Sequence, residues 1–108
     1  MTVAELCCEL GADKICLPKG EREIDGAYIG DLLSWVMGRA PADSAWITIM
    51  SNVNVVAVAS LADVACVIFA EGVEPDEQAK TRAENEGINL ISSPLAAYEL
   101  ACKLSQLI

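Results

Sequence analysis

Three pairs of residues, each with at least one polar side chain and each at the end of an apolar run, are the first candidates for chemistry in this chain of 108 residues. Each pair stands where an expected strand of a parallel sheet gives way to a helix. Ligands of open α/β sheets bind outside the carboxyl ends of the strands, and the free N–H groups that open a helix attract anions. A small ligand is therefore expected to contact this rim, with the Asp25-Gly26 pair nearby. The six rim residues are Ser51, Asn52, Glu71, Gly72, Ser92 and Ser93.

The competing interpretation of the rim is structural. Asn52, Ser92 and Ser93 are of residue types that cap helices, and a cap accepts a hydrogen bond from the first turn without binding a ligand. The carboxylate of Glu71 also counts against an anion at this place. Both interpretations stay open at the level of the sequence.

Catalytic chemistry has little support. The chain has no histidine, which is the usual general acid or base near neutral pH. It also has no G-x-x-x-x-G-K-[ST] run, so the loop that cradles phosphates in many nucleotide-binding proteins is missing. The carboxylates are concentrated at 75–86, where a solvated helix face explains them. We therefore predict a protein that is not an enzyme and carries no cofactor.

The five cysteines are expected to be reduced structural thiols of a cytoplasmic protein. Cys7 and Cys8 are adjacent and lack C-x-x-C spacing, so a metal site is not expected. Cys16 and Cys66 lie in apolar runs, and Cys102 shares a helix face with apolar residues. Most of these thiols should react slowly, and Cys8 is expected to be the most reactive.

The elements that would position these residues are organised around the stretch 45–70. Its two ends, 46–50 and 65–70, are apolar runs typical of strands that are buried on both faces in a parallel sheet. Parallel strands need a crossover, usually a helix. A helix is therefore predicted at 52–63, although its four valines favour a strand by propensity. Its predicted inward residues are Val55, Val58, Ala59 and Ala62.

Other elements follow from caps and short apolar runs. Thr2 and Glu5 form a capping box for a helix that ends at Gly11, and Asp31 and Ser93 are expected to cap two more helices. Strands are predicted at 15–17 and 88–91, an extended segment at 23–30, and helices at 32–39 and 75–86. The helix at 75–86 should carry an Asp76–Lys80 ion pair, and the last helix should turn inward Ala97, Ala101, Leu104 and Ile108.

The alternation of strands and helices predicts one α/β domain, residues 1–108, built as three layers with a mainly parallel sheet. The net charge of −9 makes nucleic-acid binding improbable, because the surface repels phosphates. The apolar fraction of 54% reflects a core and an interface, since the longest apolar stretch contains Asp63 and is flanked by acids that do not suit a membrane span. The first residues lack the basic start of a signal peptide.

The helix at 32–39 is apolar around most of its circumference. Such a helix is either buried on all sides or carries an interface, and a chain of this size has little material to surround it. We therefore expect a homodimer or a protein partner at Leu33, Trp35 and Met37.

Five segments, taken in order along the chain, carry a family resemblance: 23–33, 46–48, 54–59, 71–76 and 91–99. Together they resemble the DRTGG domain family, whose fold is found in the N-terminal domain of bacterial HPr kinase/phosphorylase. The name-giving string is absent, and Asp25-Gly26 stands where its end would fall. The resemblance implies an α/β fold, a helix at 52–63, self-association, and a regulatory or assembly role; the kinase half is absent. The alternative is a sensor of a nucleotide or other metabolite.

Overall fold

A five-stranded sheet runs through the centre of the chain, and the computed structural model describes all residues 1–108. The strands lie in the order β1-β5-β4-β3-β2. The four strands from β2 to β5 are parallel, and β1 joins β5 as an antiparallel strand at one edge. The strands are β1 Asp13–Cys16, β2 Ala27–Ile29, β3 Ala45–Thr48, β4 Cys66–Phe69 and β5 Leu90–Ser92.

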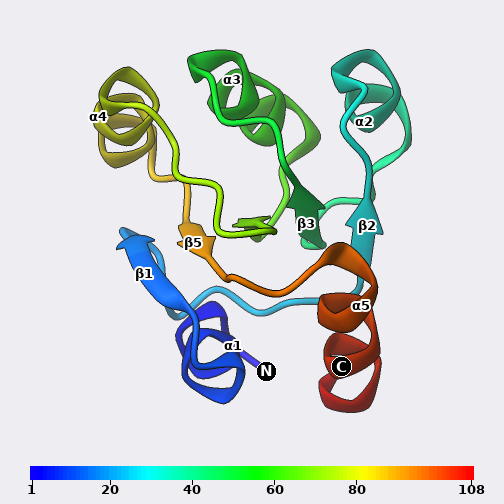
Figure 1. Cartoon of the computed structure of the whole chain (residues 1–108). Helices are drawn as coiled ribbons and strands as arrows, with labels where there is room; N and C mark the ends of the chain where they lie inside the picture. Colours follow the sequence, from blue (N-terminus) through cyan, green and yellow to red (C-terminus); the bar gives the residue numbers. More distant parts are fainter.

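Helices cover both faces of the sheet. Figure 1 shows α2, α3 and α4 over one face and α1 and α5 over the other. The predicted three-layer α/β fold with a mainly parallel sheet is therefore confirmed. None of the helices is long and apolar enough to cross a membrane. The helices are α1 Val3–Leu10, α2 Leu33–Arg39, α3 Val53–Ala62, α4 Glu77–Glu86 and α5 Ala97–Leu107.

Each face of the sheet packs its own hydrophobic cluster. The side chains of β4 alternate between the two: Cys66 and Ile68 join the cluster under α1 and α5, whereas Val67 and Phe69 join the cluster under the other three helices. All four are inaccessible to solvent. This double burial explains why the strand is a continuous apolar run without polar alternation.

The segment predicted at 52–63 is helical despite its valines. Asn52 caps α3, because its side-chain oxygen accepts a hydrogen bond from the backbone N–H two residues further on, at 2.9 Å. The buried face is wider than predicted, since Val56 is buried as well, while Ala62 is only half-buried. The reason is the position of α3 between α2 and α4 (Figure 1), where it packs against helices on both sides.

Two predicted helix starts are wrong. Asp31 does not cap α2, whose N-terminal cap is Leu32 without a side-chain hydrogen bond. Helix α5 begins at Ala97 instead of Pro94, and the Ser93 hydroxyl accepts a hydrogen bond from the N–H of Leu95 in the turn before the helix. Both residues can cap a helix, but Asp31 binds the end of β3 and Ser93 stabilises a turn.

The side-chain pairing of α4 and the inward face of α5 also differ from prediction. Asp76 caps α4 by accepting a hydrogen bond from the N–H of Ala79 at 2.8 Å, so Lys80 pairs with Glu77 instead. In α5 the buried residues are Leu100 and Leu104, whereas Ala97 and Ala101 are half-buried and Ile108 is exposed. Leu104 is thus buried as predicted, and Ala97 packs against the same hydrophobic cluster from a half-buried position.

Candidate functional site

The structure brings the six predicted rim residues to one end of the sheet, at the carboxyl ends of β3, β4 and β5. The N–H of Gly72 donates a hydrogen bond to the carbonyl of Ser93 at 2.9 Å, which joins the loops after β4 and β5. The N–H of Asp76 donates to the carbonyl of Ser51 at 3.3 Å and joins the loop after β3 to the start of α4. The predicted juxtaposition of these loops is thus present in the fold.

Most polar side chains of the rim are occupied by the fold itself. Asn52 caps α3, the Ser93 hydroxyl accepts from the N–H of Leu95, and the Ser92 hydroxyl donates to the carbonyl of Val73 at 2.9 Å. Both serines are buried. Glu71 is exposed and adopts a left-handed backbone with φ 61°. The rim therefore presents a carboxylate to solvent, which does not favour an anionic ligand.

Asp31 is the polar residue of this rim that sequence reasoning misassigned. Its carboxylate accepts a hydrogen bond from the hydroxyl of Thr48 at 2.8 Å and another from the N–H of Ile49 at 3.0 Å. It thereby ties the loop after β2 to the end of β3. The sequence did contain a signal for this role, because Asp31 directly follows the expected extended segment at 23–30. Residues that follow a parallel strand belong to the rim where ligands of α/β sheets bind.

Asp25 and Gly26 do not join the rim. They precede β2 and lie at the opposite, amino end of the parallel strands, where the N–H of Asp25 donates to the carbonyl of Asp43 and the N–H of Ala45 donates to the carbonyl of Gly26, both at 2.8 Å. The expectation that they lie near the other six residues is wrong. The cause is the direction of β2, which carries its beginning away from the carboxyl ends of its neighbours.

Asp25 and Gly26 instead line an apolar pocket of about 520 Å³. Its walls come from the segment before β2, from β2 and β3, and from one side of α5. Eight of its eleven lining residues are hydrophobic, and these include the buried side chains of Ile47 and Leu104. We call this cavity the β2–α5 pocket; its lining residues outside the chain start are Ile24, Asp25, Gly26, Ala27, Ile29, Ile47, Ala101, Leu104, Ser105 and Ile108.

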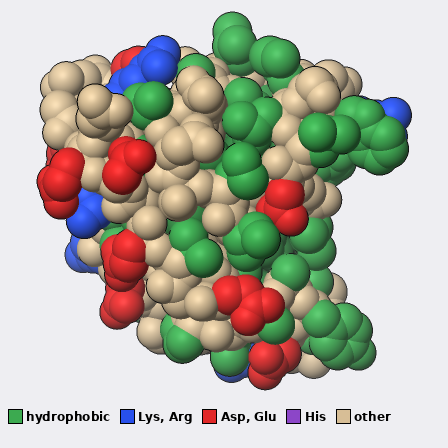
Figure 2. Space-filling view, turned by 45° about the horizontal axis from the view of Figure 1, so that its top comes forward, with side chains coloured by type: hydrophobic (Ala, Val, Ile, Leu, Met, Phe, Trp, Pro, Cys, Tyr) green, Lys and Arg blue, Asp and Glu red, His purple; other side chains and the backbone are tan.

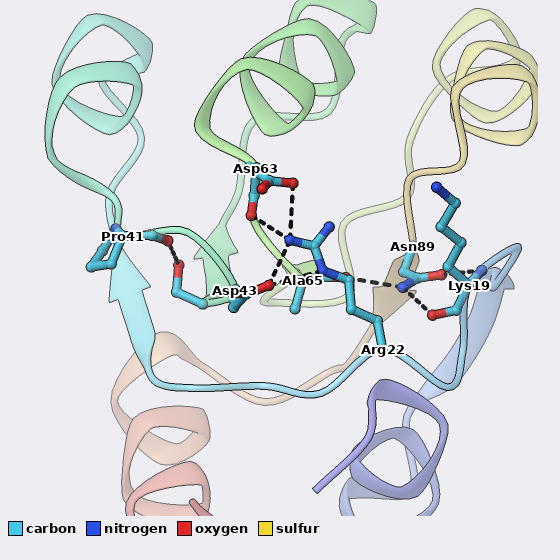
Figure 3. Close-up of polar contacts among 8 residues, drawn as sticks. Lys19, Arg22, Pro41, Asp43, Asp63, Ala65 and Asn89 are labelled. Atoms are coloured by element: carbon cyan, nitrogen blue, oxygen red, sulfur yellow. Dashed lines mark hydrogen bonds and ion pairs between the residues drawn. The ribbon is translucent and has the colours of Figure 1, made fainter.

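A polar network closes the amino end of the sheet (Figure 3). The Arg22 guanidinium donates to the carboxylates of Asp43 at 2.8 Å and Asp63 at 2.9 Å, and to the carbonyl of Asp63 at 2.7 Å. Both aspartates adopt left-handed backbone conformations, with φ 63° and φ 58°. Arg22 therefore holds together the turns before β3 and after α3, a structural task that leaves its charge neutralised.

The buried amide of Asn89 belongs to the same end of the sheet (Figure 3). Its oxygen accepts from the N–H of Lys19, and its nitrogen donates to the carbonyls of Lys19 and Ala65, each at 2.9 Å. The Asn89 side chain thus satisfies both the N–H and the carbonyl of Lys19, as a neighbouring strand would. Sequence reasoning missed this residue, because an asparagine beside an apolar run gives no sign of partners 70 positions away.

The residues predicted for an interface lie on α2 at one edge of the molecule. Trp35 is 53% exposed and Met37 is 47% exposed, whereas Leu33 is half-buried and packs against the core. The Arg39 guanidinium lies 3.7 Å from the centre of the Trp35 ring, a cation–π contact. Only Val36 of this helix is fully buried.

The cysteines divide into three buried and two exposed thiols. Cys7, Cys16 and Cys66 are buried, whereas Cys8 and Cys102 are exposed, which corrects the expectation for Cys102. Burial raises the pKa of Cys7, and it raises the pKa of Cys16 to about 11 and that of Cys66 to about 12. No group of three or more histidine, cysteine, aspartate or glutamate side chains is placed to hold a metal ion.

A thiol-counting reagent at neutral pH should therefore react quickly with two thiols of the folded protein and with all five after denaturation. The reagent attacks the thiolate, and a raised pKa lowers the fraction of thiolate at neutral pH. Mass spectrometry of the labelled peptides should identify Cys8 and Cys102. Fast labelling of Cys16 or Cys66 in the native protein would contradict the buried positions of β1 and β4.

Comparisons with known proteins bear on the fold. No protein-family model and no curated protein matches the sequence. A solved structure does match: the CBS and DRTGG domains of the regulatory region of a Clostridium perfringens pyrophosphatase, complexed with its activator diadenosine tetraphosphate. The TM-score is 0.77 at 12% sequence identity, over 97% of this chain and 46% of that chain. This chain thus spans less than half of that regulatory region, and the likeness supports a DRTGG-like α/β fold.

Proposed function

We propose that this chain is a non-catalytic regulatory or assembly module that acts by forming a homodimer. The observation that carries the proposal is a set of large apolar side chains left in solvent on and around α2, at one edge of the sheet. Five of the eight exposed large hydrophobic residues belong to it. We call this cluster the α2 face; its members are Ile29, Leu32, Trp35, Met37 and Ile49.

The fold places the members of the α2 face on and around α2, with Trp35 and Met37 on opposite flanks of the helix, either side of the buried Val36. Leu32, Trp35 and Met37 belong to α2 or its cap, and Ile29 ends the edge strand β2. Ile49 follows β3, but its N–H is bonded to the Asp31 carboxylate, which places it beside the start of α2. Figure 2 shows hydrophobic side chains gathered on the side of the molecule that carries α2, whereas the side over α4 is mainly polar.

Burial of this cluster would be favourable, since removal of apolar surface from water contributes about 25 cal/mol per Å². Monomeric soluble proteins rarely expose large contiguous apolar patches, and aromatic residues and methionine are enriched at protein interfaces. The expectation that α2 cannot bury all its apolar residues within one copy agrees with the 53% exposure of Trp35 and the 47% exposure of Met37.

The charge distribution favours a second copy as the occupant. With a net charge of −9, two copies repel each other over most of their surfaces. Helix α2 contains no acidic residue, and its one charged side chain is Arg39, which stacks on Trp35. Helix α2 therefore offers a surface without acidic side chains of its own, and the Asp31 carboxylate beside it is engaged by the hydroxyl of Thr48 and the N–H of Ile49. A two-fold axis would place the same apolar patch on both sides of the contact.

Sedimentation or light scattering at micromolar concentration tests the proposal, and we expect a dimer. The dimer should tighten as salt is raised, because salt screens the repulsion between two acidic copies but leaves the burial of apolar surface intact. A monomer at every protein and salt concentration would contradict the proposal. Weakening by salt would point to a contact that depends on opposite charges instead.

Sensing of a small molecule is the second candidate function, and one observation favours it: the solved regulatory region with a similar fold is complexed with diadenosine tetraphosphate. A thermal-shift measurement with that nucleotide separates the two candidates. A ligand present at about 100 times its Kd should stabilise the fold by roughly 2.7 kcal/mol. The exposed Glu71 on the rim is unfavourable for such an anion. A saturable shift that disappears on substitution of a rim residue would support the sensor.

A further inference from the structure

The β2–α5 pocket is a second feature that the fold leaves open, and it is separate from the α2 face except at Ile29. Its volume of about 520 Å³ lies within the range of small-molecule sites, which is roughly 300–1,000 Å³. The floor is made by side chains that no solvent reaches, such as Ile47 and Leu104. Its mouth is formed by exposed residues of β2 and of the end of α5.

The polar side chains of this pocket offer hydrogen-bond acceptors and no free donor. The Asp25 carboxylate makes no hydrogen bond or ion pair in the chain, and its residue is exposed at the pocket. The Ser105 hydroxyl donates its proton to the carbonyl of Cys102 at 2.8 Å and keeps its lone pairs free. The positive charge of the Met1 ammonium group, which also lines the pocket, is balanced by the Glu23 carboxylate at 2.9 Å. The unpaired acceptors of Asp25 and Ser105 therefore favour a ligand that supplies hydrogen-bond donors.

We propose that the β2–α5 pocket binds an apolar molecule that carries one cationic end, an ammonium or a guanidinium group. The apolar body would contact Ile24, Ile47 and Leu104, and the cation would face the Asp25 carboxylate. The net charge of −9 also attracts a cationic ligand. The same charges disfavour nucleotides and fatty acids. The proposal does not depend on dimer formation through the α2 face.

Three probes of similar length test the charge requirement: 4-phenylbutylamine, 4-phenylbutanol and 4-phenylbutyrate, titrated by calorimetry and followed by backbone amide NMR. We expect the amine to bind roughly fivefold more tightly than the alcohol, the gain of a partly exposed charge pair. The carboxylate should bind most weakly. The Asp25→Asn substitution should make the amine and the alcohol equal, because it removes the charge and keeps the shape of the side chain.

Two further variants test the location. Ala27→Phe places a ring in the pocket from an exposed position of β2, and Ser105→Phe does so from α5, so each should abolish binding of the amine. Ser60→Phe, at an exposed position of α3 on the other face of the sheet, is the matched control and should leave binding unchanged. Absence of amine binding at millimolar concentration, tighter binding of the carboxylate, or binding that survives both pocket variants would overturn the proposal. Met37→Glu should not affect it.

Discussion

Substitution of Met37 by glutamate should convert the proposed dimer to monomers. In one copy the side chain is 47% exposed, so the carboxylate can stay in water and the fold should tolerate the change. In the dimer the same carboxylate would be desolvated against an apolar partner surface, which costs several kcal/mol per ion, and symmetry makes each dimer carry two of them. We expect the dissociation constant to rise at least about 100-fold.

The matched control for this substitution is Leu61→Glu. Leu61 is 72% exposed on α3, outside the α2 face, and the change adds the same charge to the same acidic chain. Sedimentation of both variants over a range of protein concentrations is the measurement. The control should remain a dimer. An unchanged dimer in the Met37 variant, or equal weakening in both variants, would show that the contact lies elsewhere or responds only to total charge.

Substitution of Asn89 by alanine should produce the largest loss of folding stability among the polar residues. The side chain is 1% exposed and makes three hydrogen bonds at 2.9 Å to backbone groups of Lys19 and Ala65. Alanine leaves these groups without the partner that Asn89 supplies, and an unsatisfied buried polar group costs about 1–3 kcal/mol. We expect the free energy of unfolding to fall by roughly 3 kcal/mol or more.

Denaturant titration and thermal unfolding measure this effect. For a domain of this size, 1 kcal/mol corresponds to about 4–8 °C in Tm, so the melting temperature should fall by more than about 10 °C. Asn85→Ala on the exposed face of α4 removes the same chemical group without breaking an internal hydrogen bond, and it should change stability little. A loss below about 1 kcal/mol for Asn89→Ala would mean that water replaces the amide and that the loop around Lys19 is held by other contacts.

Local features of this protein could be predicted from its sequence alone. The capping box of Thr2 and Glu5 and the cap at Asn52 are contacts between residues two or three positions apart, so residue type and spacing are sufficient to identify them. The burial of β4 on both faces is visible in the sequence as an unbroken apolar run, which predicts a parallel sheet. A parallel sheet needs a crossover, and this requirement predicted the helix α3 although its valines favour a strand.

The candidate sites depended on contacts that only the tertiary structure decides. The strand-end rule correctly grouped the loops after β3, β4 and β5, but it does not say that Asp25 and Gly26 lie at the other end of β2, beside α5. The apolar residues all around α2 predicted an interface at Leu33, Trp35 and Met37. Only the packing of α2 on the sheet, through Val36, decided that Trp35 and Met37 stay in solvent.

The same limit applies to the polar groups at the ends of the sheet. Asp31 has the chemistry of a helix cap, yet its carboxylate binds the end of β3, 17 positions away. Asn89 binds a loop 70 positions away. A hydrogen bond within one turn is specified by neighbours in the chain, and it is therefore visible in the sequence. A hydrogen bond between distant segments forms only where the order and direction of the strands bring the two groups together, and that arrangement is a property of the whole core.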